Sequence, residues 1–179
     1  MTQIGSVYGQ ALYDLAKSEE LAQTILQQIT AMAQSFAQEP DFLRLLSAPN
    51  LSKQERCDIV DRSFHGKAHG YVVNFLKILV EKGKIRQFPD CCTAYRQCYY
   101  RDNGILPVTA VTALPLSQSQ SQRLNEKLTS ITGKTILLTN KVDASLMGGM
   151  RLDYDGKQLE DTIAHRLDSV RQMLKNTIL

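Results

Sequence analysis

The chain lacks any long hydrophobic run. Its most apolar stretch, around Val72 to Val80, is interrupted by Asn74 and Lys77, whereas a membrane-spanning helix needs about 20 predominantly apolar residues. The amino terminus, MTQIGSVYGQ, has no basic region followed by an apolar segment, which a secretory signal would require. We therefore expect a chain that is made and kept inside the cell, with only indirect membrane association.

The chain also lacks a concentration of charge of one sign. Its 21 Lys and Arg residues are interleaved with 18 Asp and Glu residues, the net charge is +3, and no run of five like charges occurs. A nucleic-acid-binding surface would gather Lys and Arg on one face. The composition therefore argues against a nucleic-acid partner, and a helical nucleic-acid-binding or other adaptor module is kept as the alternative.

The four cysteines do not have the spacing of a metal or redox site. Cys57 stands alone, and Cys91, Cys92 and Cys98 contain neither a C-x-x-C pair nor a second spaced pair. Structural zinc sites normally present their ligands from a tight turn. We expect these cysteines to be small hydrophobic residues in a reduced core.

Two other patterns imitate ligand sites without meeting their requirements. His65 and His69 are four residues apart, but a glycine directly follows each of them and interrupts the helix that such a metal-binding pair needs. The segment Thr132 to Thr135 resembles the end of a phosphate-binding loop, but Leu128 occupies the position of the required earlier glycine. No serine lies in a nucleophile elbow. We predict a non-catalytic protein that binds no metal and no cofactor.

The most strongly patterned stretch is Tyr71 to Ile85. On a helix its apolar side chains cover an arc of about 220°, roughly twice the stripe that one core needs. Such a helix is either enclosed by its own bundle or offers part of its surface to another chain. Gly83, followed by Pro89, is expected to end it. The apolar positions are Tyr71, Val72, Val73, Phe75, Leu76, Ile78, Leu79 and Val80.

Apolar residues at intervals of three and four predict further helices on both sides of this stretch. We expect them at about residues 20–38, 41–46 and 53–64, the last led by a capping box from Ser52 to Glu55, and from Pro89 to Gly104. Residues 1–104 are therefore predicted to form a six-helix bundle. The first helix has an apolar stripe from which Tyr13 is absent, made of Ile4, Val7, Tyr8, Ala11, Leu12, Leu15 and Ala16.

At Gly104 the period of the pattern changes. Residues 105–113 are rich in β-branched side chains and predict a strand with Pro107 near its start or on an edge. Further strands are expected at 135–139 and 150–154, and the Asp155-Gly156 turn should return the chain through 157–159. Helices are expected after the capping box that starts at Ser117 and over about 161–176. Residues 105–179 are thus predicted to be a small α+β domain with a short sheet and two helices, and the whole chain to be α + (α+β).

The glycine pair Gly148-Gly149 lies between two of these strands. Glycine there allows positive φ or a close approach of two backbones, so a bulge or tight crossing is the preferred interpretation. An anion-binding nest of backbone N–H groups is the alternative.

Several stretches, in order along nearly the whole chain, resemble one known family. They are residues 8–16 (YGQALYDLA), 74–76 with 81–85 and 88–89, and 141–152 followed by Gly156 and residues 162–167. They resemble the delta subunit of bacterial F-type ATP synthases, the family of the mitochondrial oligomycin-sensitivity-conferring protein. Two local departures exist: the family's Pro-Tyr-Ala reads Val7-Tyr8-Gly9, and its Asp-Gly-Ser turn reads Glu160-Asp161-Thr162. Gly9 is expected to loosen the first helix by up to about 1 kcal/mol.

The resemblance implies a non-catalytic stator subunit at the cytoplasmic face of the bacterial cell membrane. In this family the helical domain grips amino-terminal segments of the alpha subunits of the catalytic head, chiefly with its first and fifth helices, as a helix held in a groove. The carboxyl-terminal domain joins the b subunits of the peripheral stalk, with the last helix and its neighbours as the expected contact. The head is thereby held still against the rotor during proton-driven ATP synthesis, and no homo-oligomer is expected. By family position and helical phase, the expected alpha-binding residues are Tyr8, Ala11, Leu12, Leu15, Asn74, Phe75 and Ile78.

Overall fold

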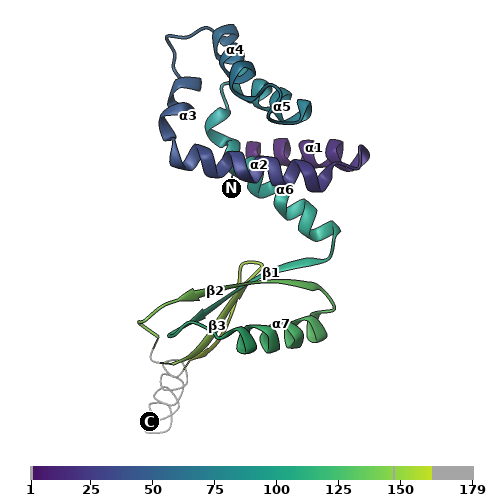
Figure 1. The fold of residues 1–179 in the computed structure, drawn as a ribbon, viewed down its shortest axis with the longest axis vertical. Helices are drawn as coiled ribbons and strands as arrows, with labels where there is room; N and C mark the ends of the chain where they lie inside the picture. Colours follow the sequence, from purple (N-terminus) through teal and green to yellow (C-terminus); the bar gives the residue numbers. More distant parts are fainter. Residues whose placement is uncertain (1, 147, 163–179) are drawn as a thin grey trace, which may run out of the picture. The chain divides into compact units, whose positions relative to one another are not determined.

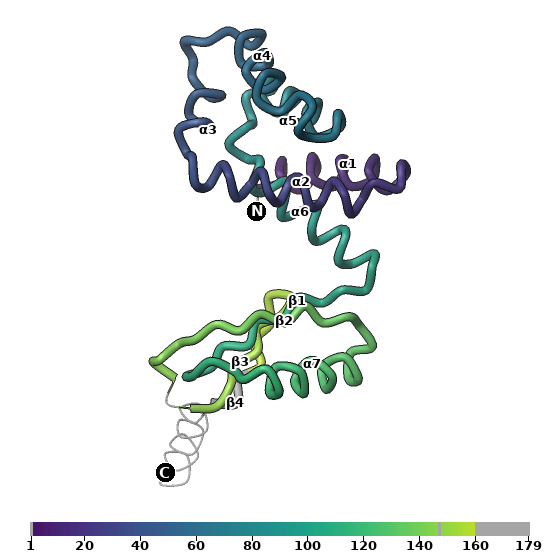
Figure 2. The backbone as a smooth tube through the Cα atoms, in the orientation of Figure 1, coloured from purple at the N-terminus to yellow at the C-terminus, as the bar shows by residue number. Residues whose placement is uncertain are grey.

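The computed structural model describes residues 2–146 and 148–162 of the chain (Figure 1). The chain divides into two compact units, residues 1–100 and 101–179. The first unit is helical, and in it α2 returns alongside α1 (Figure 2). Its elements are α1 (Gln3–Ser18), α2 (Ala22–Gln38), α3 (Pro40–Leu46), α4 (Lys53–Phe64), α5 (Gly70–Glu81), the 3-10 turn η1 (Ile85–Gln87) and α6 (Phe88–Asp102).

Local capping groups set the ends of these helices as predicted. Ser52 and Glu55 form a reciprocal capping box at the start of α4. Gly83 adopts φ +66 just beyond α5, and the next N–H, of Lys84, donates to the carbonyl of Leu79 at 2.7 Å. This left-handed glycine satisfies carbonyls that the helix end would otherwise leave unpaired. The predicted stop of the central helix is confirmed.

Five phenylalanines from five helices make up one part of the helical core. The ring of Phe36 on α2 lies 5.5 Å from Phe42 on α3, 6.0 Å from Phe64 on α4 and 5.2 Å from Phe88 on α6. Phe88 also lies 6.4 Å from Phe75 on α5. Aromatic clusters of this size bury a large apolar area, so this cluster joins five helices into one core.

The cysteines are part of the same core, as predicted. All four are free and buried. The thiol of Cys92 donates to the carbonyl of Ile29 at 3.6 Å, and burial raises the pKa of Cys92 to about 12 and that of Cys91 to about 11. Thiols this hard to ionise are poor nucleophiles and poor metal ligands. Cys92 packs α6 against α2 as a small hydrophobic side chain.

The second unit contains a four-stranded mixed sheet with strand order β2-β1-β3-β4. β1 is parallel to β2 and antiparallel to β3, and β3 is antiparallel to β4. The helix α7 (Gln118–Thr132) connects β1 to β2, and its Leu124 and Leu128 pack on the core of the sheet (Figure 1). The strands are β1 (Ile105–Thr112), β2 (Thr135–Val142), β3 (Gly149–Tyr154) and β4 (Lys157–Thr162).

Special backbone positions agree with the predicted turns. Asp155 and Gly156 adopt φ +47 and +71, as a tight hairpin with positive φ at both central residues requires. Gly133 adopts φ +66 at the end of α7. The segment that resembled a phosphate-binding loop is therefore the end of a helix, terminated by this glycine.

Pro107 lies in a central strand, but pairing with β3 begins only at Val108, one residue later. Its missing N–H therefore costs that ladder nothing.

One boundary prediction is wrong. The last helix was expected to start near Asp161, but Asp161 and Thr162 belong to β4, because the hairpin ladder continues to the Gly149–Thr162 pair. The remainder of that expected helix, 163–176, lies outside the described residues. At the same open end of the hairpin, on the β3 side, Gly148 and Gly149 adopt φ +142 and +85. These values fit the conformational interpretation of the glycine pair.

Candidate functional site on the exposed faces of α1 and α5

The side of α1 that faces the core is set by two glycines. A Cβ at Gly9 would overlap the carbonyl oxygen of Cys91 and lie 2.7 Å from the Cβ of Ala94, and a Cβ at Gly5 would lie 2.5 Å from the Cβ of Asp90. Glycines four residues apart therefore let α1 approach α6 closely. Gly9 therefore has a packing role in addition to its expected cost in helix propensity, because this glycine permits the close packing of α1 on α6.

This contact also turns α1 about its axis relative to the predicted stripe. Tyr13, placed outside the apolar stripe by periodicity, is buried with 3% of its surface exposed, and its ring lies edge-on to Tyr95 at 5.3 Å. That prediction is wrong because Gly5 and Gly9, which have no apolar side chain, mark the inner face. The buried residues of α1 are Gly5, Gly9, Leu12, Tyr13 and Ala16.

The outer face of α1 is consequently apolar and exposed. Val7 is 62% exposed and Leu15 is 42% exposed, and Ala11 between them is exposed as well. Tyr8 is half-buried, and Leu12 is 5% exposed and packs in the core beneath. Sequence reasoning counted Val7 in the stripe but not in the site. The four-residue spacing of Val7, Ala11 and Leu15 is the signal that identifies it.

Most of the wide apolar arc of α5 packs into the core of the chain itself. Of the expected binding residues on this helix, Phe75 is 7% exposed, whereas Asn74 is exposed and Ile78 is 43% exposed. The interpretation of α5 as a helix enclosed by its own bundle therefore holds for most of its apolar residues. Ile78 is the apolar residue of this helix that faces outward. The buried residues are Val72, Val73, Phe75, Leu76, Leu79 and Val80.

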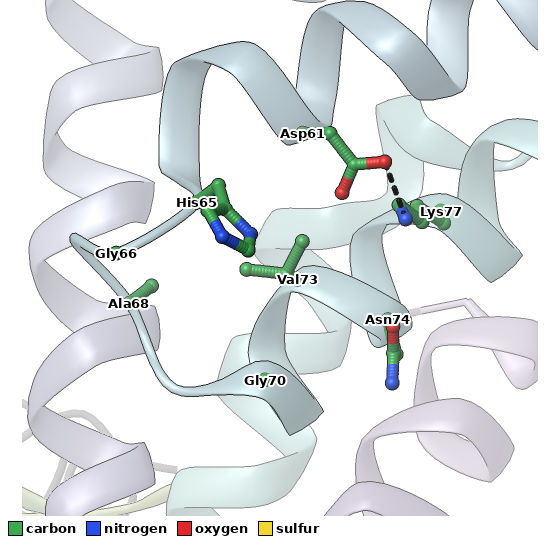
Figure 3. A pocket seen from close by; sticks show the side chains of 8 residues that line it. All are labelled: Asp61, His65, Gly66, Ala68, Gly70, Val73, Asn74 and Lys77. Carbon is green, nitrogen blue, oxygen red and sulfur yellow. Dashed lines mark ion pairs between the residues drawn. The ribbon is translucent and has the colours of Figure 1, made fainter.

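A hollow of about 500 Å³ lies between α4 and α5 beside this face (Figure 3). An ion pair between Lys77 and Asp61 crosses it, and the side chain of Asn74 points away from that pair. Among the described residues, no group of three His, Cys, Asp or Glu side chains could hold a metal ion.

Of the two histidines near this hollow, His69 has a structural role. It is the N-cap of α5, where its Nδ1 accepts the N–H of Tyr71 at 3.3 Å and its ring lies 4.9 Å from the Tyr71 ring. The backbone N–H of His69 donates to the side-chain carbonyl oxygen of Gln28 at 2.8 Å. His65 is exposed at the end of α4. The loop interpretation thus holds for His65, whereas His69 is half-buried and fixes the start of α5.

The start of α1 is held by Asp90 of α6. The N–H of Thr2 donates to the Asp90 carboxylate at 2.8 Å, and the Thr2 hydroxyl accepts the N–H of Gly5 at 3.2 Å as the helix N-cap. The hydrogen bonds from Thr2 lower the pKa of Asp90 below its usual value. This contact fixes the first turn of α1 and hence the direction of its exposed face.

A pH titration should report this contact. Because the pKa of Asp90 is lowered in the folded state, its contribution is present above the ordinary value of 3.8 and is lost as the pH falls below it. We expect the amide resonances of Thr2 and Gly5 to move with one acidic transition in that range. Asp90→Asn should abolish the transition. An unchanged transition in that variant would contradict the assignment.

Comparison with known proteins identifies the family. The family model described as ATP synthase delta (OSCP) subunit matches residues 4–174. The chain belongs to this family. It is 27% identical over 176 residues to the ATP synthase subunit delta of Clostridioides difficile, a match that covers 98% of this chain and 97% of that protein. It is 30% identical over 173 residues to that of Lactobacillus gasseri, covering 96% and 94%.

A solved structure shares the fold of this delta-family chain. A chain in the cryo-EM structure of the Toxoplasma gondii mitochondrial ATP synthase hexamer matches with a TM-score of 0.76 and 19% identity, covering 97% of this chain and 98% of that chain. The family membership predicted from the sequence is confirmed. The chain is a non-catalytic, peripheral-stalk component of an F-type ATP synthase, which couples ATP synthesis to proton transport. No helix among its described residues is long and apolar enough to span a membrane.

Proposed function

We propose that the six-helix amino-terminal bundle, residues 1–104, binds amino-terminal segments of the alpha subunits, and that residues 105–179 bind the b subunits of the peripheral stalk. The chain then links the catalytic head to the stalk at the cytoplasmic face of the bacterial membrane and holds the head against rotor torque. One observation carries the head-binding proposal: α1 and α5 expose apolar side chains, including Val7, Leu15 and Ile78, on a unit whose other apolar residues are mostly buried.

The chemistry of these faces suits an amphipathic helix of the partner. α1 and α5 both pack against α2, so their outer faces have a common support (Figure 2). An amphipathic helix buries apolar residues at intervals of three and four, which is also the spacing of the exposed apolar residues on α1. Leu12 and Phe75 are buried beneath this surface and shape it from below. The proposed contact residues are Val7 and, from the expected set, Tyr8, Ala11, Leu15, Asn74 and Ile78, whereas Leu12 and Phe75 of that set support them from beneath.

Ile78→Asp should weaken this contact strongly without unfolding the chain. A carboxylate in a desolvated apolar contact leaves a charge without a partner, so we expect at least a 30-fold loss of affinity, about 2 kcal/mol. Because 43% of Ile78 is exposed in the isolated chain, the free energy of unfolding should fall by less than about 1 kcal/mol. Calorimetric titration with an alpha-subunit amino-terminal peptide gives the affinity, and urea denaturation gives the stability.

Leu45→Asp is the matched control. Leu45 lies on α3 and is also 43% exposed, but it is outside the proposed surface. This variant should bind the peptide like the unaltered chain. Equal affinity of both variants would refute the head-binding proposal, and a large loss of stability in Ile78→Asp would place Ile78 in the core instead.

A further inference from the structure

Among the described residues, the outer strand β2 leaves an ordered row of backbone groups without a strand partner. The N–H of Thr135 donates to Gly104, and that of Asp143 donates to Thr112, each at 2.9 Å. In a parallel ladder, alternate residues of a strand bond to the same neighbour. The odd-numbered residues of β2 therefore bond to β1. The even-numbered residues direct their N–H and C=O groups outward, and they are Ile136, Leu138, Asn140 and Val142.

Within the described part of the chain, no strand pairs along this outer edge. Asn125 of α7 donates its side-chain amide to the carbonyl of Ile136 at 3.4 Å, where a neighbouring strand would otherwise donate. Six of the eight residues of β2 are exposed, among them Leu137 and Val142 at 47% each. A long, exposed and apolar edge strand is a template for pairing, which monomeric proteins usually avoid.

Charge and apolar surface around the edge restrict what can pair there. Lys134 and Lys141 are exposed near its two ends, and β2 contains no acidic residue. Ile131, in the last turn of α7, is 71% exposed just before β2 begins. The edge therefore offers main-chain hydrogen bonds, apolar surface and positive charge to one partner.

We infer that β2 is a pairing edge for an extended, acidic segment of another subunit of the synthase. Outward N–H and C=O groups at every second residue require an extended backbone, and the apolar residues along the edge require apolar side chains at alternate positions. The two lysines favour carboxylates in the partner. A second copy of this chain fits poorly, because two β2 strands would bring four lysines together, and the nearest carboxylate, that of Asp143 just beyond each strand, already accepts hydrogen bonds from Ser145. This inference rests on membership of the complex and is independent of the alpha-subunit contact.

Amide hydrogen exchange tests the edge residue by residue. In the isolated chain we expect the amides of Leu137, Thr139 and Lys141 to be protected by β1, and those of Leu138 and Val142 to exchange freely. In the assembled synthase, labelled intact and then dissociated for measurement, the even-numbered amides should slow by at least about tenfold. Fast exchange of these amides in the synthase would overturn the proposal.

Val142→Pro provides a second, independent measurement. It removes one outward N–H and leaves the ladder to β1 intact, which an edge position tolerates. We expect about tenfold weaker incorporation into a synthase that lacks this subunit, whereas the control Val142→Ala, which keeps the N–H, should incorporate normally. Equal incorporation of the two variants would overturn the proposal. So would sedimentation of the isolated chain as a dimer that Val142→Pro dissociates, since the occupant would then be a second copy.

Discussion

Gly9→Ala is expected to lower the free energy of unfolding by about 3 kcal/mol, although alanine is the better helix former. In an exposed helix this substitution would stabilise by up to about 1 kcal/mol. Here the added methyl group would overlap the carbonyl oxygen of Cys91 and come within 2.7 Å of the Cβ of Ala94. Backbone cannot move aside as a flexible side chain can, so α1 must shift away from α6.

Gly70→Ala is the control for this prediction. Gly70 is the first residue of α5, and a Cβ there would meet nothing within 4 Å. This variant should be unchanged or slightly more stable. Urea denaturation followed by circular dichroism measures both variants. A Gly9→Ala chain as stable as Gly70→Ala would show that α1 and α6 are not in close contact.

Displacement of α1 from α6 should also weaken partner binding. The exposed residues Val7, Ala11 and Leu15 keep their chemistry in Gly9→Ala, but the helix that carries them is displaced. We therefore expect weaker binding of the alpha-subunit peptide even at temperatures where the variant remains folded, because a preorganised surface is lost.

Phe88→Ala is expected to cause the largest loss of stability, about 4 kcal/mol. Phe88 is completely buried, and its ring contacts Phe36 on α2 and Phe75 on α5. Truncation removes the buried ring and leaves a cavity between helices that belong to one core. Since native domains are stable by only about 5–15 kcal/mol, this change removes a large share of the total.

Phe88→Leu separates the cavity from other effects. Leucine refills most of the space, so its cost should be less than half that of alanine. Urea denaturation of both variants measures the difference. Equal losses for the two substitutions would show that the ring's aromatic contacts, and not the filled volume, stabilise this part of the core.

Much of the fold could be predicted because its signals are local. The capping boxes at Ser52 and Ser117, the left-handed glycines at the ends of α5 and α7, and the Asp155-Gly156 hairpin each depend on residues within a few positions of one another. Such signals act through the backbone hydrogen bonds at each element's ends. The end of β4 was misplaced because a ladder can continue through residues that also suit a helix.

The candidate site was less predictable. Periodicity identified apolar positions on α1 and α5 but did not distinguish inward from outward ones. Leu12 and Phe75 proved to be buried, Val7 to be exposed, and Ile78 to be the outward remainder of a wide arc. Orientation depends on contacts between residues far apart in the chain, which no local window contains.

The sequence by itself indicated that the chain is non-catalytic, predicted the order and kind of its elements, and contained the residue pattern that identifies its family. These follow from residue chemistry and from spacing along one element. Only the tertiary structure decided which side of α1 faces outward and that β2 forms an open edge. The first depends on the close contact of Gly5 and Gly9 with α6, and the second on which strands pair, because both are set by packing between distant segments.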